Sequence, residues 1–357
     1  MKIHQILYTV TAIFALLSIG ILWACKDSSF QHPKNLTVLL YSEYIAPDMI
    51  TDFQMKTGYK LQLELYEALD EMIAKLNDHG DKHYDVIIAS DVVIPQLIGL
   101  GLVAPIDTNK IPNRVNIAEQ FKSPSYDPEN TYTLPYLWGT TGILYNDTTI
   151  DPNNVSYSML FDASQTKGKF SLLDESHSML SMALQAKGFN ANSTNPWEIN
   201  QAADLLLNAK KDPNFSGFDG SVNGKDKILS GENWASIVFN GEAMTAIAAN
   251  PTLRFAIPNE GSFMWIDAMT LSSGARNIEG AYAFINYILD AKVGAKLAKF
   301  INYATPNKAA LQIIDENFKT NHGINPTRED LDRMVFLLNP GEKNQFLNDA
   351  WNAIKTR

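Results

Sequence analysis

Residues 35–66 read NLTVLLYSEYIAPDMITDFQMKTGYKLQLELY, and this stretch decides the class of fold. Its first part, residues 35–42, is an almost continuous apolar run of the kind found in buried strands. Pro47 stands where a first helical turn accepts proline, apolar residues follow at helical spacing, and Gly58 is a stop signal. Residues 59–66 then alternate apolar and polar side chains, which indicates a second strand.

The same alternation of strand and helix signals continues to residue 102. Residues 68–80 repeat the helical spacing, residues 84–90 (YDVIIAS) form another buried-type strand, and residues 91–102 indicate a further helix. The order strand, helix, strand, helix, strand, helix predicts an α/β lobe with a largely parallel sheet. Ligands of such sheets bind outside the carboxyl ends of the strands.

Polar side chains follow two of these predicted strands. Tyr41, Ser42 and Tyr44 come at the end of the first strand, and Ser90 and Asp91 come at the end of the third. These residues are candidates for a binding site at the edge of the sheet. Ser and Asp are also common helix N-caps, so a capping role is the alternative for Ser90.

The segment SFMWIDAMTL, residues 262–271, places an acid inside an apolar strand. Side chains in a strand alternate between faces, so Phe263, Trp265, Asp267 and Met269 share one face. A carboxylate in such a strand is seldom buried without a partner. We therefore interpret Asp267 as a functional residue that requires a partner.

Three later segments complete the outline of secondary structure. Residues 132–146 predict a strand that crosses into a second lobe, residues 234–244 predict another strand, and residues 279–307 predict one long amphipathic helix. Residues 219–226 (DGSVNGKD) resemble the start of a calcium loop, but Ser230 stands where such a loop needs Glu, so we expect an ordinary turn.

The composition excludes several classes of function. The chain has 357 residues, enough for two lobes, and 29 Lys and Arg against 39 Asp and Glu. The basic residues are scattered, so we expect no nucleic-acid partner, whereas an acidic chain suits a cationic one. The six histidines lack metal-ligand spacing, and no nucleophile elbow or phosphate-binding glycine loop is present. We expect a monomer that is not an enzyme, without cofactor, metal or catalytic residues.

The N-terminus carries an export segment. Residues 6–24 form an apolar run that stops at Cys25, the single cysteine of the chain. The run resembles a bacterial lipoprotein signal, which implies lipidation of Cys25 after cleavage and a body in the periplasm or on the outer face of the cytoplasmic membrane. A retained membrane anchor is the alternative.

Several stretches together resemble the periplasmic polyamine-binding proteins of ABC importers, the spermidine- and putrescine-binding type. They are YSEYIAPDMITDFQMKTGYKL (41–61), YDVIIASDVVIPQL (84–97), LPYLWGTTGILYN (134–146), VFNGEAM (238–244), FMWIDAM (263–269) and NYATPNKAA (302–310). The resemblance implies the two-lobed, hinge-closing periplasmic-binding-protein fold (type II) with discontinuous lobes. The implied division is a signal peptide (1–24), a tether (25–35), lobe 1 (36–140 plus 253–303) and lobe 2 (141–252 plus 304–357).

The resemblance also implies a ligand site in the cleft between the lobes. The matching positions are Tyr41, Ser42, Tyr44, Ser90, Asp91, Glu175, Phe239, Glu242, Trp265, Asp267 and Tyr303. Tyr41 and Phe239 stand where the family usually has Trp. Ser178 and Leu337 replace an acid and an amide of spermidine-binding members, which puts spermidine itself in doubt.

The expected function is therefore the capture of a polyamine, a putrescine- or spermidine-like cation, and its delivery to an ABC permease. The membrane is expected as a partner only through the N-terminal anchor. Two alternatives remain: a cleft adapted to another small cation or an amino acid, and a sensor or adhesin lipoprotein that is not coupled to transport.

Overall fold

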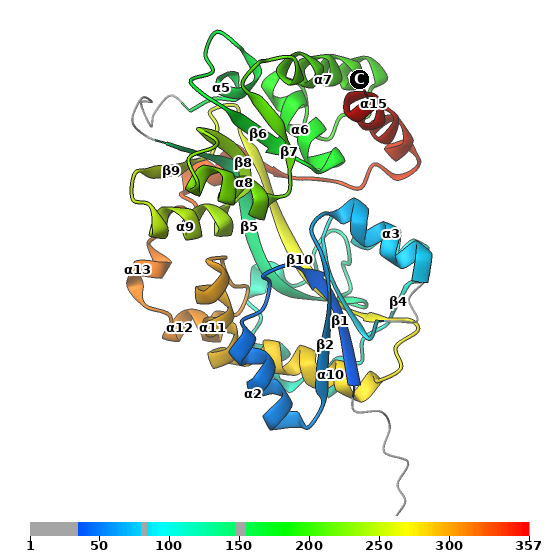
Figure 1. The fold of residues 1–357 in the computed structure, drawn as a ribbon. Helices are drawn as coiled ribbons and strands as arrows, with labels where there is room; N and C mark the ends of the chain where they lie inside the picture. Colours follow the sequence, from blue (N-terminus) through cyan, green and yellow to red (C-terminus); the bar gives the residue numbers. More distant parts are fainter. Residues whose placement is uncertain (1–34, 80–83, 147–154, 357) are drawn as a thin grey trace, which may run out of the picture.

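A computed structural model describes residues 35–79, 84–146 and 155–356. It has two α/β halves, joined by the long strands β5 (Thr133–Asn146) and β10 (Ser262–Ser272) that run from one half into the other (Figure 1). The export segment and Cys25 lie outside the described residues.

The remaining strands are β1 (Asn35–Tyr41), β2 (Lys60–Tyr66), β3 (Val86–Ser90), β4 (Val103–Ala104), β6 (Phe170–Leu173), β7 (Phe215–Asp219), β8 (Ala235–Phe239), β9 (Leu253–Ala256) and β11 (Met334–Phe336). The α-helices are α2 (Pro47–Thr57), α3 (Leu69–His79), α4 (Ile94–Gly99), α5 (Ser158–Phe161), α6 (Ser176–Ala186), α7 (Pro196–Lys210), α8 (Ser221–Leu229), α9 (Asn240–Ala249), α10 (Ile278–Ile288), α11 (Ala291–Ile301), α12 (Lys308–Ile313), α13 (Glu316–Lys319), α14 (Arg328–Asp332) and α15 (Asn344–Thr356). Short 3₁₀ turns are η1 (Thr108–Lys110), η2 (Pro112–Asn116), η3 (Glu119–Phe121) and η6 (Gly341–Lys343).

The strands follow the order β2-β1-β3-β10-β5-β8-β6-β7, with β4 and β11 paired to β10 and β9 paired to β5. The half drawn at the bottom of Figure 1 is called the lower half, and the other the upper half. In the lower half β1 is parallel to β2 and β3, and in the upper half β6 is parallel to β7 and β8. The expected α/β class is confirmed. The order of the elements from β1 to α4 matches the predicted alternation of strands and helices.

The core of the lower half lies between its sheet and the helices α2 and α10. Leu39 of β1 and Ile87 of β3 are fully buried, as their apolar runs require. Phe53 of α2 and Phe284 of α10 meet in this core, with their rings edge to face and 5.6 Å apart. The central strand β3 is buried along its whole length, whereas the edge strand β2 is largely exposed.

Strand β5 belongs to both halves. Its residues 133–140 pair with β10, and its residues 141–145 pair with β8. Strand β9 pairs with the same upper part of β5. After β10 the chain returns to the lower half, where Asn307 Nδ2 donates a hydrogen bond to the carbonyl of Leu289. These contacts place β9 in the upper half and the segment around Asn307 in the lower half.

Three predictions of local structure are wrong. Residues 279–307 form two helices, because Asp290 caps α11 by accepting hydrogen bonds from the amides of Lys292 and Val293. The strand predicted over residues 234–244 ends at Phe239, where α9 begins. The turn predicted over residues 219–226 is the first part of α8.

Gly142 of β5 lies where the backbone of β9 comes close in the upper half. A Cβ there would lie 2.6 Å from the carbonyl oxygen of Ala256 and 2.7 Å from the ring of Phe255. We expect Gly142→Ala to lower the free energy of unfolding by about 1–3 kcal/mol, as overpacking usually does, measured by urea denaturation. Gly99→Ala is the matched control, since a Cβ there meets nothing within 4 Å. Equal effects of the two substitutions would contradict the prediction.

Candidate functional site

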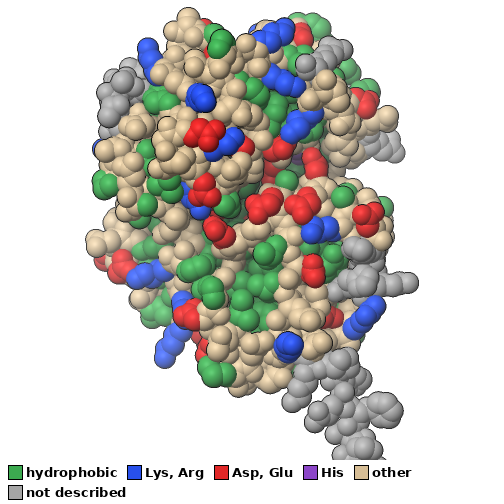
Figure 2. Space-filling view, viewed as in Figure 1, with side chains coloured by type: hydrophobic (Ala, Val, Ile, Leu, Met, Phe, Trp, Pro, Cys, Tyr) green, Lys and Arg blue, Asp and Glu red, His purple; other side chains and the backbone are tan. Residues whose placement is uncertain are grey.

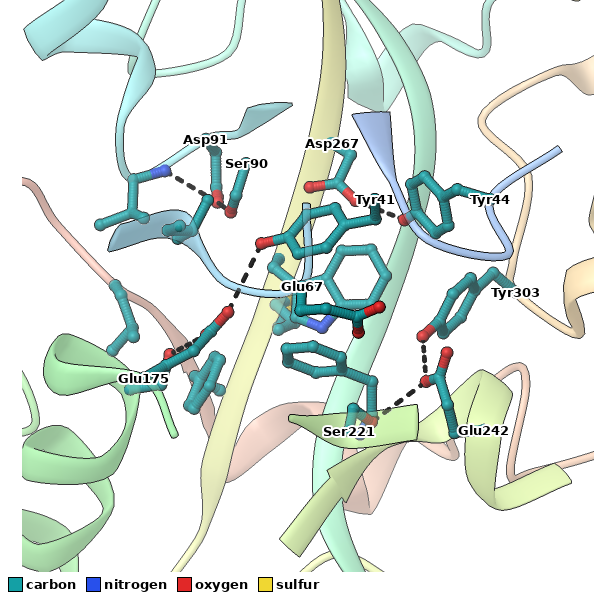
Figure 3. Close-up of a pocket in the computed structure, with 18 of the residues that line it drawn as sticks. Tyr41, Tyr44, Glu67, Ser90, Asp91, Glu175, Ser221, Glu242, Asp267 and Tyr303 are labelled. Atoms are coloured by element: carbon teal, nitrogen blue, oxygen red, sulfur yellow. Dashed lines mark hydrogen bonds between the residues drawn. The ribbon is translucent and has the colours of Figure 1, made fainter. Parts of the chain in front are cut away.

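A cavity lies between the two halves, at the carboxyl ends of β1 and β3 and beside the middle of β10 (Figure 3). Acidic side chains gather along the groove between the halves (Figure 2). The cavity leaves about 50 Å³ for the centres of water-sized molecules, room for a few waters or a slim alkyl chain. All eleven residues predicted from sequence line it: Tyr41, Ser42, Tyr44, Ser90, Asp91, Glu175, Phe239, Glu242, Trp265, Asp267 and Tyr303.

Three buried carboxylates stand in this cavity. Asp91 follows β3, Glu175 precedes α6, and Asp267 lies within β10, with exposed fractions of 6%, 7% and 2%. Glu67 and Glu242 bring the acidic side chains to five. Among the described residues that line the cavity, none is Lys, Arg or His. The lining is therefore acidic and includes no basic side chain that could compensate the charge of these groups.

Strand pairing places Asp267 beside the end of β3. Asp267 is opposite Ser90, and the pairing of β10 with β5 shifts register between Asp267 and Ala268. Such an irregularity commonly re-aims a side chain. Of the four residues that period-two spacing puts on one face, Phe263, Trp265 and Asp267 line the cavity, whereas Met269, beyond the register shift, does not. The partner that Asp267 requires is the hydroxyl of Tyr44, which donates to its Oδ2.

Ser90 does not cap a helix. Its hydroxyl donates a hydrogen bond to Asp91 Oδ1 at 2.9 Å, and that oxygen also accepts from the amide of Val92. The residue before α4 is Val93, which makes no side-chain cap. The capping alternative for Ser90 is therefore wrong, because its hydroxyl is directed to the carboxylate in the cavity.

Burial raises the pKa of all three carboxyl groups. The pKa of Asp267 rises to about 8, because burial and the nearby charges of Asp91 and Glu175 outweigh the hydrogen bond from Tyr44. Burial likewise raises the pKa of Asp91 and of Glu175 to about 7. These groups exchange protons near neutral pH, so a cation that enters the cavity competes with protons.

Glu242 forms the opposite side of the cavity from Glu175 in Figure 3. Its Oε2 accepts hydrogen bonds from the hydroxyls of Tyr303, at 2.5 Å, and Ser221, at 3.3 Å. Burial raises the pKa of Glu242, whereas these hydroxyls and the charge of Lys225 lower it. Glu175 accepts from Tyr41, at 3.5 Å, and from Ser178, at 3.0 Å. Both ends of the cavity thus present hydrogen-bonded carboxylates.

Aromatic rings line the space between the carboxylates. Trp265 packs edge to face on Tyr303, with ring centroids 4.9 Å apart, and on Phe239, at 5.6 Å. Tyr44 packs on Tyr41 at 5.6 Å and on Tyr303 at 5.9 Å. The rings form a continuous chain across the two halves. Such walls can cover methylene groups and can attract cations through their faces.

Sequence reasoning missed part of the lining. The residues beyond the predicted set are Glu67, Leu69, Val92, Ser178, Ser221, Val222, Phe263, Met264 and Leu337. Ser178 and Leu337 had been noted as departures from the family, and Phe263 had been placed on the same strand face as Trp265 and Asp267. Glu67 follows β2, so the rule of strand carboxyl ends could have found it. Ser221 is the first residue of α8, which the sequence had suggested was a turn.

Comparison of the chain with known proteins finds solute-binding proteins both by family model and by overall sequence identity. A model of the bacterial extracellular solute-binding protein family matches residues 48–326. A spermidine/putrescine-binding periplasmic protein of Salmonella typhimurium is 29% identical over 95% of this chain and 97% of its own length. A putrescine/cadaverine-binding protein of Pseudomonas aeruginosa is 31% identical over 91% and 94%.

The fold is similar to a solved spermidine/putrescine ABC transporter substrate-binding protein of Streptococcus pneumoniae. The TM-score is 0.74 and the identity 28%, over 90% of this chain and 98% of that one. Within the described part of the chain, no helix is both long and apolar enough to cross a membrane.

The raised pKa values predict how stability depends on pH. In the unfolded chain these carboxyls titrate near pH 4, so between pH 4 and 8 the folded chain holds more protons than the unfolded one. Their contribution to stability is present at low pH and is lost as the pH rises through about 7 to 8. Between pH 5 and pH 8.5 we expect the free energy of unfolding of the ligand-free protein to fall by at least about 1.4 kcal/mol, the equivalent of one pKa unit.

The measurement is urea denaturation at several pH values. Asp267→Asn is the matched variant, because it keeps an acceptor for Tyr44 but removes the titrating group. It should flatten the dependence of stability on pH. A wild-type stability that rises over this interval, or a variant with an unchanged slope, would contradict the assignment.

Proposed function

The chain belongs to the family of bacterial extracellular solute-binding proteins, and we propose that it captures a linear polyamine in the cleft and delivers it to an ABC importer. The observation that carries this proposal is the lining of the cavity: five carboxylates, a chain of aromatic rings and no basic side chain among the described residues. The relatives named above for spermidine, putrescine and cadaverine support the same ligand class.

The physical chemistry of a polyamine fits this lining. Such a ligand is a flexible methylene chain with protonated amines, so it needs separated carboxylates for its charges and flat walls for its methylenes. Charge-assisted hydrogen bonds to carboxylates are roughly twice as strong as neutral ones, and a desolvated cation on an aromatic face gains about 2 kcal/mol. We propose that Asp267, Glu175 and Glu242 meet the amines, with Asp91 as a further charge.

The remaining predicted residues have supporting parts in this proposal. Trp265, Phe239, Tyr41 and Tyr303 cover the methylenes, and Tyr44 orients Asp267 through its hydrogen bond. Ser42 and Ser90 supply hydroxyls at the strand ends. The same carboxylates oppose anions such as sulfate and phosphate, because binding an anion there would leave buried like charges together.

Closure of two lobes over the ligand is the proposed signal to the permease. Contacts already cross between the halves: Tyr41 donates to Glu175, and Lys225 Nζ lies 3.3 Å from Glu43 Oε2. A ligand held by carboxylates of both halves would favour the closed form, which is a population shift. We propose the division expected from sequence, in which residues 36–140 plus 253–303 form lobe 1 and residues 141–252 plus 304–357 form lobe 2. Two local exceptions are β9, which pairs with the upper part of β5, and Asn307, which bonds to Leu289 of the lower half.

We further propose that the protein acts as a monomer outside the cytoplasm and makes or breaks no covalent bond. The periplasmic relatives support an extracytoplasmic location. We propose attachment to the membrane through lipid on Cys25, since the apolar run before it resembles a lipoprotein signal.

A thermal-shift panel tests the ligand class. Putrescine, cadaverine, spermidine, spermine and agmatine are compared with amino acids and sugars. A ligand at 100 times its Kd adds about 2.7 kcal/mol of stability, so binding gives a clear rise in Tm. We expect rises only with the amines. A panel in which amino acids or sugars stabilise the protein and amines do not would overturn the proposal.

Asp267→Asn tests the assigned carboxylate. Because the substitution removes the charge that faces the amine, we expect the free energy of polyamine binding to weaken by at least about 2 kcal/mol in calorimetric titration. Asp204→Asn, an exposed change of the same charge on α7, is the control and should leave the affinity unchanged. Unchanged affinity in Asp267→Asn would remove this residue from the site.

Metabolic labelling with radioactive palmitate tests the anchor. The wild-type protein should incorporate label and remain with the membrane fraction, whereas Cys25→Ser should lose the label because it lacks the thiol that is acylated. A wild-type protein that is membrane-bound but unlabelled would instead support the retained anchor.

A further inference from the structure

A second compartment adjoins the cavity on its Glu175 side. It leaves about 150 Å³ for the centres of water-sized molecules, more than the first cavity. The two share four wall residues, Leu69, Val92, Glu175 and Ser178. The other residues that line the second compartment are Asp70, Ile73, Val93, Gln96, Ser176, His177, Asn339, Pro340, Asn344 and Asn348.

The chemistry of this compartment favours a cation. Asp70 stands at its rim and Glu175 in the shared wall, and none of the described residues that line it is Lys or Arg. The side chains of Gln96, Asn344 and Asn348 make no hydrogen bond within the described residues, so their amide oxygens are available as acceptors. Burial lowers the pKa of His177 to about 4, so this imidazole is uncharged at neutral pH and does not repel a cation.

Glu175 links the two compartments. One carboxylate oxygen accepts from Tyr41 in the first cavity, and the other accepts from Ser178 in the shared wall. After burial, the charge of Asp70 is among the causes that raise the pKa of Glu175. Asp70 on α3 and Glu175 before α6 are thus neighbouring acids from opposite halves of the molecule, and no Lys or Arg is among the described residues that line the compartment they share.

We propose that this second compartment is a subsite for an additional ammonium group of a linear polyamine, held between Asp70 and Glu175 and by the amide oxygens of Gln96 and Asn348. The inference rests on the proposed function and deepens it, since it selects a triamine over a diamine. A diamine fills the first cavity alone. In a triamine, the additional methylenes pass Leu69 and Val92, and the additional amine enters the second compartment.

The side chains of the shared wall support this path for the ligand. Leu69 and Val92 offer apolar surface for methylenes, and Ser178 is small and has its hydroxyl engaged with Glu175. The departure at Ser178 from the acid of spermidine-binding relatives therefore does not exclude a third amine. The charge that would meet this amine lies farther along, at Asp70.

Calorimetric titration with putrescine and spermidine tests the subsite. We expect the wild-type protein to bind spermidine at least tenfold more tightly than putrescine. Asp70→Asn should weaken spermidine binding at least fivefold and change putrescine binding less than twofold. Asn348→Leu, which fills the compartment without changing charge, should act in the same selective way. Asp204→Asn controls for the loss of one acidic charge elsewhere.

The outcomes separate the two proposals. If wild-type protein binds neither amine, the proposed function itself fails. If it binds putrescine but gains nothing from the third amine, or if Asp70→Asn and Asn348→Leu weaken both ligands equally, the polyamine function stands and the subsite is overturned.

Discussion

The structure depends on one constraint, which is the burial of carboxylates that have no fixed cation beside them. Asp267, Glu175 and Asp91 are almost inaccessible to solvent, and no Lys or Arg is among the described residues that line their cavity. A buried, unpaired charge is costly, so each group must either hold a proton or meet a cation from outside. Their raised pKa values express the first solution, and a bound amine would provide the second.

The arrangement of β5 and β10 makes this constraint a property of both halves. Asp267 lies in β10, beside the end of β3, while Trp265 two residues earlier contacts Phe239 of β8 in the other half. Tyr303, which follows α11, reaches Glu242 on α9. One continuous sheet therefore holds side chains of both halves around the same small space. Each half supplies some of the acids, so the charge of the cavity is a joint property of the two halves.

The sequence was sufficient for the elements whose signals are local. The strand-helix alternation located the ends of β1 and β3, and period-two spacing brought Trp265 and Asp267 to one face. Residues of the upper half, such as Glu175 and Glu242, were found only through family resemblance, because their proximity depends on how α6 and α9 pack. The break at Asp290 was missed because an acid within an amphipathic pattern can be either a surface residue or a cap. The second compartment joins α3, α6 and α15, and no local pattern predicts that meeting.

Lys225 shows what a resident cation does in this protein, and why its position matters. It is buried on α8, and it joins the upper half to Glu43, which has a left-handed backbone (φ 57°) just after β1. Burial raises the pKa of Glu242, and the charge of Lys225 only partly opposes this rise; Lys225 does not line the cavity. Because this fixed cation stays outside the cavity, the inner acids have no lysine beside them, and in the proposed function the ammonium groups of the ligand supply the missing positive charge.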